Sequence, residues 1–173
     1  ERKLDDVFAV QFEIATAGAA GMDASLHSAE EKRIEQRPSQ NVTEWDLVVR
    51  GRWIYFQGYE GDIKKGIHGA RLLFEKAIDV NPRFARAFVE LAVTYYLDYW
   101  FKTTEPSSMI VDRLEEAAQR SIMLDPHLAR AHWIMAGAHE LRGELSEGLA
   151  SCNRAIEIDP SLSDAYRFLG SFL

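Results

Sequence analysis

Two histidines are the side chains whose type and spacing best suit metal chemistry. His132 and His139 lie seven residues apart, so on a helix their imidazoles share one face. A zinc-enzyme motif would add a His-x-x-x-His pair with a neighbouring Glu, or a set of carboxylates, and neither accompanies these two residues. We therefore predict that both imidazoles fill packing positions and form local hydrogen bonds, and that the chain binds no metal or other cofactor.

The single cysteine, Cys152, is the other candidate for chemistry. A nucleophilic thiol needs an activating base, and His139 on the preceding predicted helix is the nearest one. A buried packing thiol is the simpler interpretation, because free cysteine is among the residue types most often buried. One cysteine excludes an internal disulfide and a cysteine-rich zinc site, and it is consistent with a reducing, cytoplasmic compartment.

The glycine-rich segment GYEGDIKKGIHG, residues 58–69, has the composition of a phosphate-binding loop but not its motif. No apolar strand precedes it and the G-K-[ST] end is missing, so we predict a flexible connection between two helices. Because no nucleophile in the chain is paired with a convincing base, we expect no catalytic residue and no enzyme activity from this segment. A hydrolase or metal enzyme on a helical scaffold stays open as the least favoured alternative.

The overall composition is that of a folded acidic chain. It has 173 residues, 47% of them hydrophobic, with a formal charge of −7 and a pI near 5.3. No run of Lys and Arg residues is longer than a pair such as Lys64-Lys65, which argues against nucleic-acid binding. No apolar run approaches the roughly 20 residues of a membrane-spanning helix, so we expect no membrane contact by this segment.

Three twelve-residue segments repeat one pattern. They are AIDVNPRFARAF from residue 77, SIMLDPHLARAH from residue 121 and AIEIDPSLSDAY from residue 155. Their prolines, Pro82, Pro126 and Pro160, are 44 and 34 residues apart. A period of 34 residues predicts two antiparallel helices per unit, and the longer interval predicts ten added residues between the helices of one unit.

The residues inside these units resemble the tetratricopeptide repeat (TPR) family, whose first helix, helix A, carries W-x2-L-G-x2-Y. The matching positions are Phe88, Leu91, Ala92 and Tyr95 in one unit, and His132, Met135, Ala136 and His139 in the next, where Gly148, Cys152, Ala155 and Pro160 match the second helix. The resemblance implies an all-α fold, a right-handed TPR superhelix (an α-α solenoid), in which stacked units bury a continuous core.

The chain divides into two predicted parts. Residues 1–40 form a long N-terminal helix and a linker, the tail of an upstream domain. Residues 41–173 form the TPR array, with units at about 44–84, 85–128 and 129–162 and a lone helix at 163–173. The first two units have lengthened connections between their helices, which we expect to project aromatic-rich ledges from one edge. Since the array ends within a unit, and Glu1 is not a Met, we expect a piece of a longer protein.

The N-terminal segment DDVFAVQFEIA resembles the closing stretch of the TolB-like domain of bacterial signalling proteins. In such proteins TPR units follow that domain, and a class III adenylate or guanylate cyclase domain, or a winged-helix DNA-binding domain, precedes it. The resemblance implies a protein-protein interaction and assembly segment of a multidomain bacterial signalling protein, with a cyclase as the favoured parent. A TPR sensor segment of a winged-helix transcriptional regulator is the alternative.

The resemblance also assigns a binding groove on the inner surface of the superhelix. Its predicted residues are Arg86, Val89, Val93 and Tyr96 in the second unit, Arg130, Trp133 and Glu140 in the third, and Arg52 and Tyr55 in the first. Leu97, Gly137, Leu141, Trp45, Val48 and Phe56 complete the set. Two arginines with Tyr96 and Trp133 predict aromatic anchors and cationic ends, which are typical of peptide-binding hot spots.

Two other roles for these positions stay open. Some of them would pack against the N-terminal helix, or against a second copy in a homodimer formed through that helix or through the open face of the last helix. Gripping of a C-terminal carboxylate is not expected, because co-chaperone repeats use Lys and Asn where this chain has Val89, Val93, Trp133 and Gly137.

Overall fold

The computed structural model describes residues 43–102 and 107–172, which form seven helices and no strand. The helices are α2 (Glu44–Glu60), α3 (Ile63–Val80), α4 (Ala85–Phe101), α5 (Ser107–Leu124), α6 (Ala129–Arg142), α7 (Leu145–Ile158) and α8 (Ser163–Phe172). The fold is all-α, an array of antiparallel helices as predicted. The predicted N-terminal helix and the TolB-like segment lie outside the described residues, so the division at residue 40 stays a prediction.

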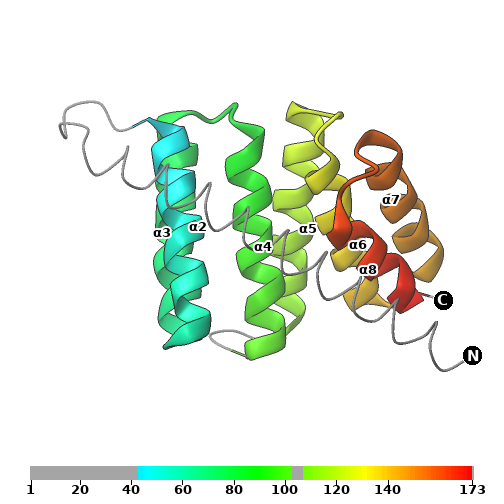
Figure 1. The fold of residues 1–173 in the computed structure, drawn as a ribbon, viewed down its shortest axis with the longest axis horizontal. Helices are drawn as coiled ribbons and strands as arrows, with labels where there is room; N and C mark the ends of the chain where they lie inside the picture. Colours follow the sequence, from blue (N-terminus) through cyan, green and yellow to red (C-terminus); the bar gives the residue numbers. More distant parts are fainter. Residues whose placement is uncertain (1–42, 103–106, 173) are drawn as a thin grey trace, which may run out of the picture. The chain divides into compact units, whose positions relative to one another are not determined.

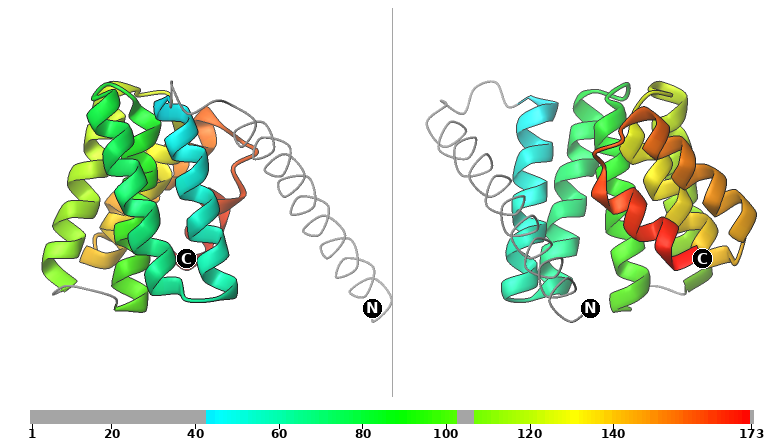
Figure 2. Two further views of the ribbon diagram at one scale, coloured as in Figure 1. Left: turned by 90° about the vertical axis from the view of Figure 1, so that its left-hand side faces the viewer. Right: turned by 45° about the vertical axis from the view of Figure 1, so that its right-hand side comes forward.

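The described helices run alternately down and up, and they lie in two rows (Figure 1; Figure 2). Helices α2, α4, α6 and α8 contact one another in succession, and α3, α5 and α7 fill the spaces between them on one side. Among the described helices, α3, α5 and α7 do not contact one another. The even-numbered helices therefore form the inner row of the solenoid, and the odd-numbered helices form its outer row.

The turn that repeats three times in the sequence has the same structure each time. Asn81, Asp125 and Asp159 each accept, through the side-chain Oδ1, a hydrogen bond from the backbone N–H two residues further on, at 3.0, 3.0 and 2.9 Å. The proline between donor and acceptor has a fixed φ that suits this turn. Each odd-numbered helix therefore ends at an Asn-Pro or Asp-Pro pair, and the next even-numbered helix begins three or four residues later.

Most of the added residues of the first two units lengthen helices rather than loops. Helices α2 and α4 have 17 residues and α6 has 14, whereas α3 and α5 have 18 and α7 has 14. The prediction of a flexible connection at residues 58–69 was wrong, because only Gly61 and Asp62 separate α2 from α3. The glycines serve close packing instead: a Cβ on Gly66 would lie 2.7 Å from the Gly58 Cα.

Small residues at equivalent positions hold the helices together. Ala87, Ala131 and Ala165 are fully buried, one in the first turn of each of α4, α6 and α8. Large and small side chains exchange places between units, since Gly51 on α2 faces Phe74 on α3, whereas the equivalent positions in the next unit hold Tyr95 and Ala118. The volume between paired helices is thus filled in both units with opposite residue choices.

Candidate protein-binding surface

The structure places the predicted groove residues at very different depths. Val89, Val93 and Trp133 are buried, with 1%, 7% and 5% of their surface exposed. The other six are accessible: Arg86 is exposed, and Arg52, Tyr55, Tyr96, Arg130 and Glu140 are partly exposed. The even-numbered helices pack directly on one another, so residues aimed at the neighbouring helix are covered. Val89, Val93 and Trp133 thus belong to the interior, which corrects their assignment as ligand-facing residues.

Exposed aromatic side chains lie instead at the C-terminal ends of α2 and α4. Phe56, Tyr59, Trp100 and Phe101 are 40%, 50%, 55% and 41% exposed, and we call this group the aromatic surface. The Tyr59 and Phe101 rings meet edge to face with centroids 6.1 Å apart, which joins α2 to α4. Of the four, only Phe56 was assigned to the groove, although the sequence predicted aromatic ledges in these two units.

Two partly buried tyrosines support the aromatic surface from beneath. The Tyr55 ring contacts Phe56 and Tyr59, with centroids 4.8 and 5.3 Å away. The Tyr96 ring contacts Trp100 at 6.2 Å. Burial raises the pKa of both phenols, and hydrogen bonds to Tyr59 and Glu140 raise the pKa further for Tyr55 and Tyr96 respectively. Both phenols therefore stay protonated at neutral pH and act as packing groups and hydrogen-bond donors.

The predicted cationic ends of the groove are largely neutralised inside the protein. The Arg130 guanidinium lies 3.4 Å from a carboxylate oxygen of Glu90 on α4 and 3.9 Å from one of Asp164 on α8. It also stacks over the Trp133 ring at 5.1 Å. Arg130 thus links three even-numbered helices, which gives it a structural role. Arg86, in contrast, lies over the exposed Trp45 ring at 5.3 Å, near the opposite end of the helices from the aromatic surface.

The two histidines form local hydrogen bonds, and the cysteine lies in the core. His132 donates from Nε2 to the Pro126 carbonyl oxygen at 2.9 Å, and His139 donates from Nδ1 to Glu144 Oε2 at 2.7 Å. Within the described residues, no three His, Cys, Asp or Glu side chains lie close enough to hold a metal ion. Cys152 is fully buried, and burial raises the pKa of its thiol to about 11, opposite to the change that a nucleophile needs.

None of the described helices is both long and apolar enough to cross a bilayer.

Comparison with known proteins gives one related sequence and several similar structures. The chain is 29% identical over 153 residues to "Putative adenylate cyclase 3" of Rhizobium meliloti (strain 1021), a match that covers 85% of this chain. The chain spans only 24% of the length of that relative. No family model matches the sequence.

The similar structures are TPR domains at low sequence identity. The first TPR of Spaghetti (RPAP3), bound to the HSP90 peptide SRMEEVD, has a TM-score of 0.58 at 16% identity and covers 75% of this chain and 90% of that one. The TPR domain of Arabidopsis OM64 has a TM-score of 0.57 at 15% identity, covering 75% of this chain and 93% of that one. These likenesses show that the chain has the TPR fold.

Proposed function

We propose that this chain is a non-catalytic, cytoplasmic protein-interaction and assembly segment of a multidomain bacterial signalling protein, a class III adenylate or guanylate cyclase. The relative named an adenylate cyclase supports this parent, because three quarters of its length lies beyond the matched region and has room for a catalytic domain. The peptide-bound TPR structure supports the interaction role, since the same fold there holds a short peptide.

The observation that carries the proposal is the aromatic surface. Four large rings stand at least 40% exposed on two adjacent helices, whereas large exposed apolar groups on folded proteins are usually single and scattered. Aromatic side chains provide much contact area for little loss of conformational freedom, so they dominate the binding energy of many interfaces. A partner helix or extended peptide with apolar side chains is the ligand that this surface fits.

Signalling through this surface requires a difference in affinity between two states of the parent protein. A partner changes the output of a distant catalytic domain only if it binds one arrangement of the domains more tightly than another. We therefore expect docking on the aromatic surface to favour one arrangement of the cyclase domains over the others.

A photo-crosslinker tests the location of the interface. Benzoylphenylalanine replaces Trp100 in one variant and Leu145 in another; Leu145 is 57% exposed on α7, away from the aromatic surface. Within the full-length protein in its host cells, we expect a crosslinked partner at position 100 and none at position 145. Trp100→Ala should then weaken the identified complex at least tenfold, as expected for a hot-spot residue, while the variant keeps its helical content. Equal crosslinking at both positions, or unchanged affinity, would contradict the proposal.

The parent protein is tested by its own coding sequence. Upstream of Glu1, a cyclase parent requires a catalytic domain with metal-binding aspartates, and a transcriptional regulator requires a winged helix with a basic recognition helix. If a winged helix is found there, the parent protein is a transcriptional regulator and not a cyclase, and the aromatic surface remains the proposed interaction site.

A further inference from the structure

A second candidate binding site lies on the other side of α4 from the aromatic surface. Helices α4 and α5 line a pocket of about 500 Å³, within the range of ligand-binding pockets. Its apolar lining comes from Phe88, Leu91 and Tyr95 on α4, and from Ala117 and Met123 on α5. Helices α3 and α5 both pack on α4 but do not contact one another, and the pocket opens between them.

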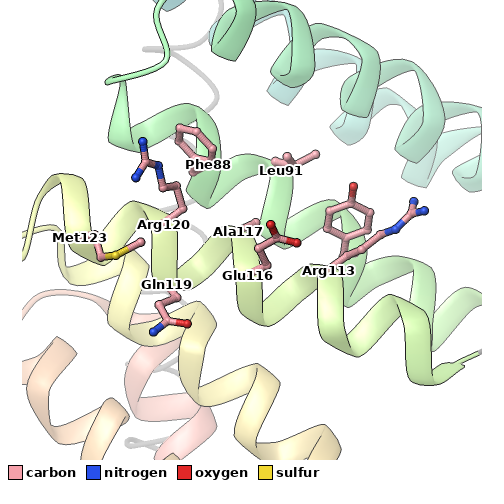
Figure 3. Close-up of a pocket in the computed structure, with 9 residues that line it drawn as sticks. Phe88, Leu91, Arg113, Glu116, Ala117, Gln119, Arg120 and Met123 are labelled. Carbon is pink, nitrogen blue, oxygen red and sulfur yellow. The ribbon is translucent and has the colours of Figure 1, made fainter.

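Two arginines lie at opposite ends of this pocket (Figure 3). Arg113 lies beside the Tyr95 phenol, with which it shares a hydrogen bond. Arg120 lies beside the Phe88 ring at the other end, and Glu116 lies between the two arginines (Figure 3). No described residue forms an ion pair with Arg120. In a chain with a formal charge of −7, this end of the pocket is a local cationic site beside apolar side chains.

The next repeat shows what is unusual about Arg120. Its equivalent, 34 residues on, is Arg154, which donates a hydrogen bond from Nη1 to Glu157 Oε2 at 3.0 Å, one helical turn away. At the position equivalent to Glu157, the pocket has Met123, which is 61% exposed. One repeat thus neutralises its arginine with a neighbouring carboxylate, and the other places an apolar side chain beside an arginine without that partner.

We propose that this pocket binds a peptide segment of a partner protein, which inserts a large apolar side chain over Phe88 and Leu91 and places a nearby carboxylate on Arg120. The guanidinium and the carboxylate form the charge-assisted pair that Glu157 supplies to Arg154 in the next repeat. A peptide fits better than a small molecule, because most of the polar lining is exposed and two helices alone enclose little of a small ligand. Glu116 disfavours a second carboxylate in the middle of the pocket.

A randomised heptapeptide library tests this site. Each sub-library fixes one position as one of the twenty amino acids, and the immobilised chain selects from it. We expect enrichment of Leu, Met or Phe together with Asp or Glu one to four positions away. For the best such peptide, replacing its acidic residue by the corresponding amide should weaken binding about tenfold, and its binding should shift the NMR resonances of Leu91 and Met123.

Variants of the pocket separate this site from the aromatic surface. Arg120→Gln should weaken the acidic peptide about tenfold and leave its amide counterpart unaffected. Met123→Glu, which copies the Arg154–Glu157 arrangement, should do the same. Arg154→Gln and Trp100→Ala are the matched controls and should leave binding unchanged. The proposal is overturned if no peptide is enriched, if the enriched peptides need no acidic residue, if Arg120→Gln has no effect, or if N-acetylphenylalanine binds as tightly as the peptide.

Discussion

The Tyr96 hydroxyl donates a hydrogen bond to Glu140 Oε2 at 2.9 Å, joining equivalent positions of α4 and α6 that lie 44 residues apart. The same tyrosine ring contacts Phe168 of α8, with centroids 5.5 Å apart. Three even-numbered helices therefore meet at one side chain, which also supports Trp100 of the aromatic surface. Tyr96 couples the stability of the array to the shape of the proposed interface.

Removing the Tyr96 hydroxyl should destabilise the array measurably. Tyr96→Phe keeps the ring contacts and deletes a hydrogen bond to a carboxylate, which is worth about 1.5–3 kcal/mol when buried and less at this partly exposed position. We expect a loss of about 1 kcal/mol in the free energy of unfolding, measured by urea denaturation. Tyr166→Phe is the control, because Tyr166 is 48% exposed. Equal losses in the two variants would show that the Tyr96–Glu140 bond contributes nothing.

The pair formed by Arg71 and Asp98 should be among the most sensitive contacts of the structure. The Asp98 side chain is 1% exposed and pairs with Arg71, which joins α3 to α4. Arg71 also donates to Thr94 Oγ1 at 3.1 Å and lies over the Tyr95 ring at 4.4 Å. Arg71→Gln removes a cation that pairs with a buried carboxylate, so we expect a loss of roughly 3 kcal/mol in unfolding free energy.

An exposed ion pair provides the comparison for Arg71. Arg154→Gln removes a pair whose side chains are 47% and 64% exposed, so its cost should be below about 0.5 kcal/mol. Calorimetric unfolding of both variants measures the difference. Similar unfolding temperatures for the two variants would mean that the Arg71–Asp98 pair is replaced by other contacts without cost.

Two glycines should respond oppositely to the same substitution. A Cβ on Gly66 would lie 2.7 Å from the Gly58 Cα, a backbone atom that cannot rotate away, so Gly66→Ala should cost about 2 kcal/mol or more. Gly170 on α8 has nothing within 4 Å of its added Cβ, so Gly170→Ala should stabilise the chain by about 0.5 kcal/mol. Thermal unfolding of the two variants measures both effects. A tolerated Gly66→Ala would mean that α2 and α3 can separate.

The buried thiol predicts a dependence of stability on alkaline pH. Burial raises the pKa of Cys152 from 9.0 to about 11, so the folded state keeps a proton that the unfolded chain releases above pH 9. The stabilising contribution of this thiol is therefore complete below pH 9 and is lost as the pH rises through 11. The destabilisation caused by Cys152→Ala, measured in urea, should shrink over that range.

The reactivity of the same thiol provides an independent check. In the folded protein at pH 8, Cys152 should react with a disulfide reagent only as fast as the chain opens, because the side chain is fully buried. In urea it should react at the rate of an ordinary exposed thiol. Fast labelling of the native chain would mean that α7 opens independently of the rest of the array.

The repeating helical architecture could be predicted from the sequence because its signals are local. The Asn-Pro and Asp-Pro turns depend on hydrogen bonds between residues two apart, and the buried alanines follow the helical period within each unit. Helix α3 ends at Val80, immediately before the Asn81-Pro82 pair of the first such turn. In the first unit the small residue is on the first helix (Gly51) and the large one on the second (Phe74), the opposite of Tyr95 and Ala118 in the next unit. This exchange makes the first unit match the TPR sequence pattern less well, but it does not change the fold of that unit.

Only the tertiary structure decided which predicted groove residues face outward, because exposure depends on the distance between helices that are far apart in sequence. Close packing of the even-numbered helices buries Val89 and Trp133, and the extra turns of α2 and α4 place Tyr59 and Trp100 at the surface. The pocket beside Arg120 has the same origin, since it exists where α3 and α5 stay apart. Local sequence patterns contain no information about such spacing.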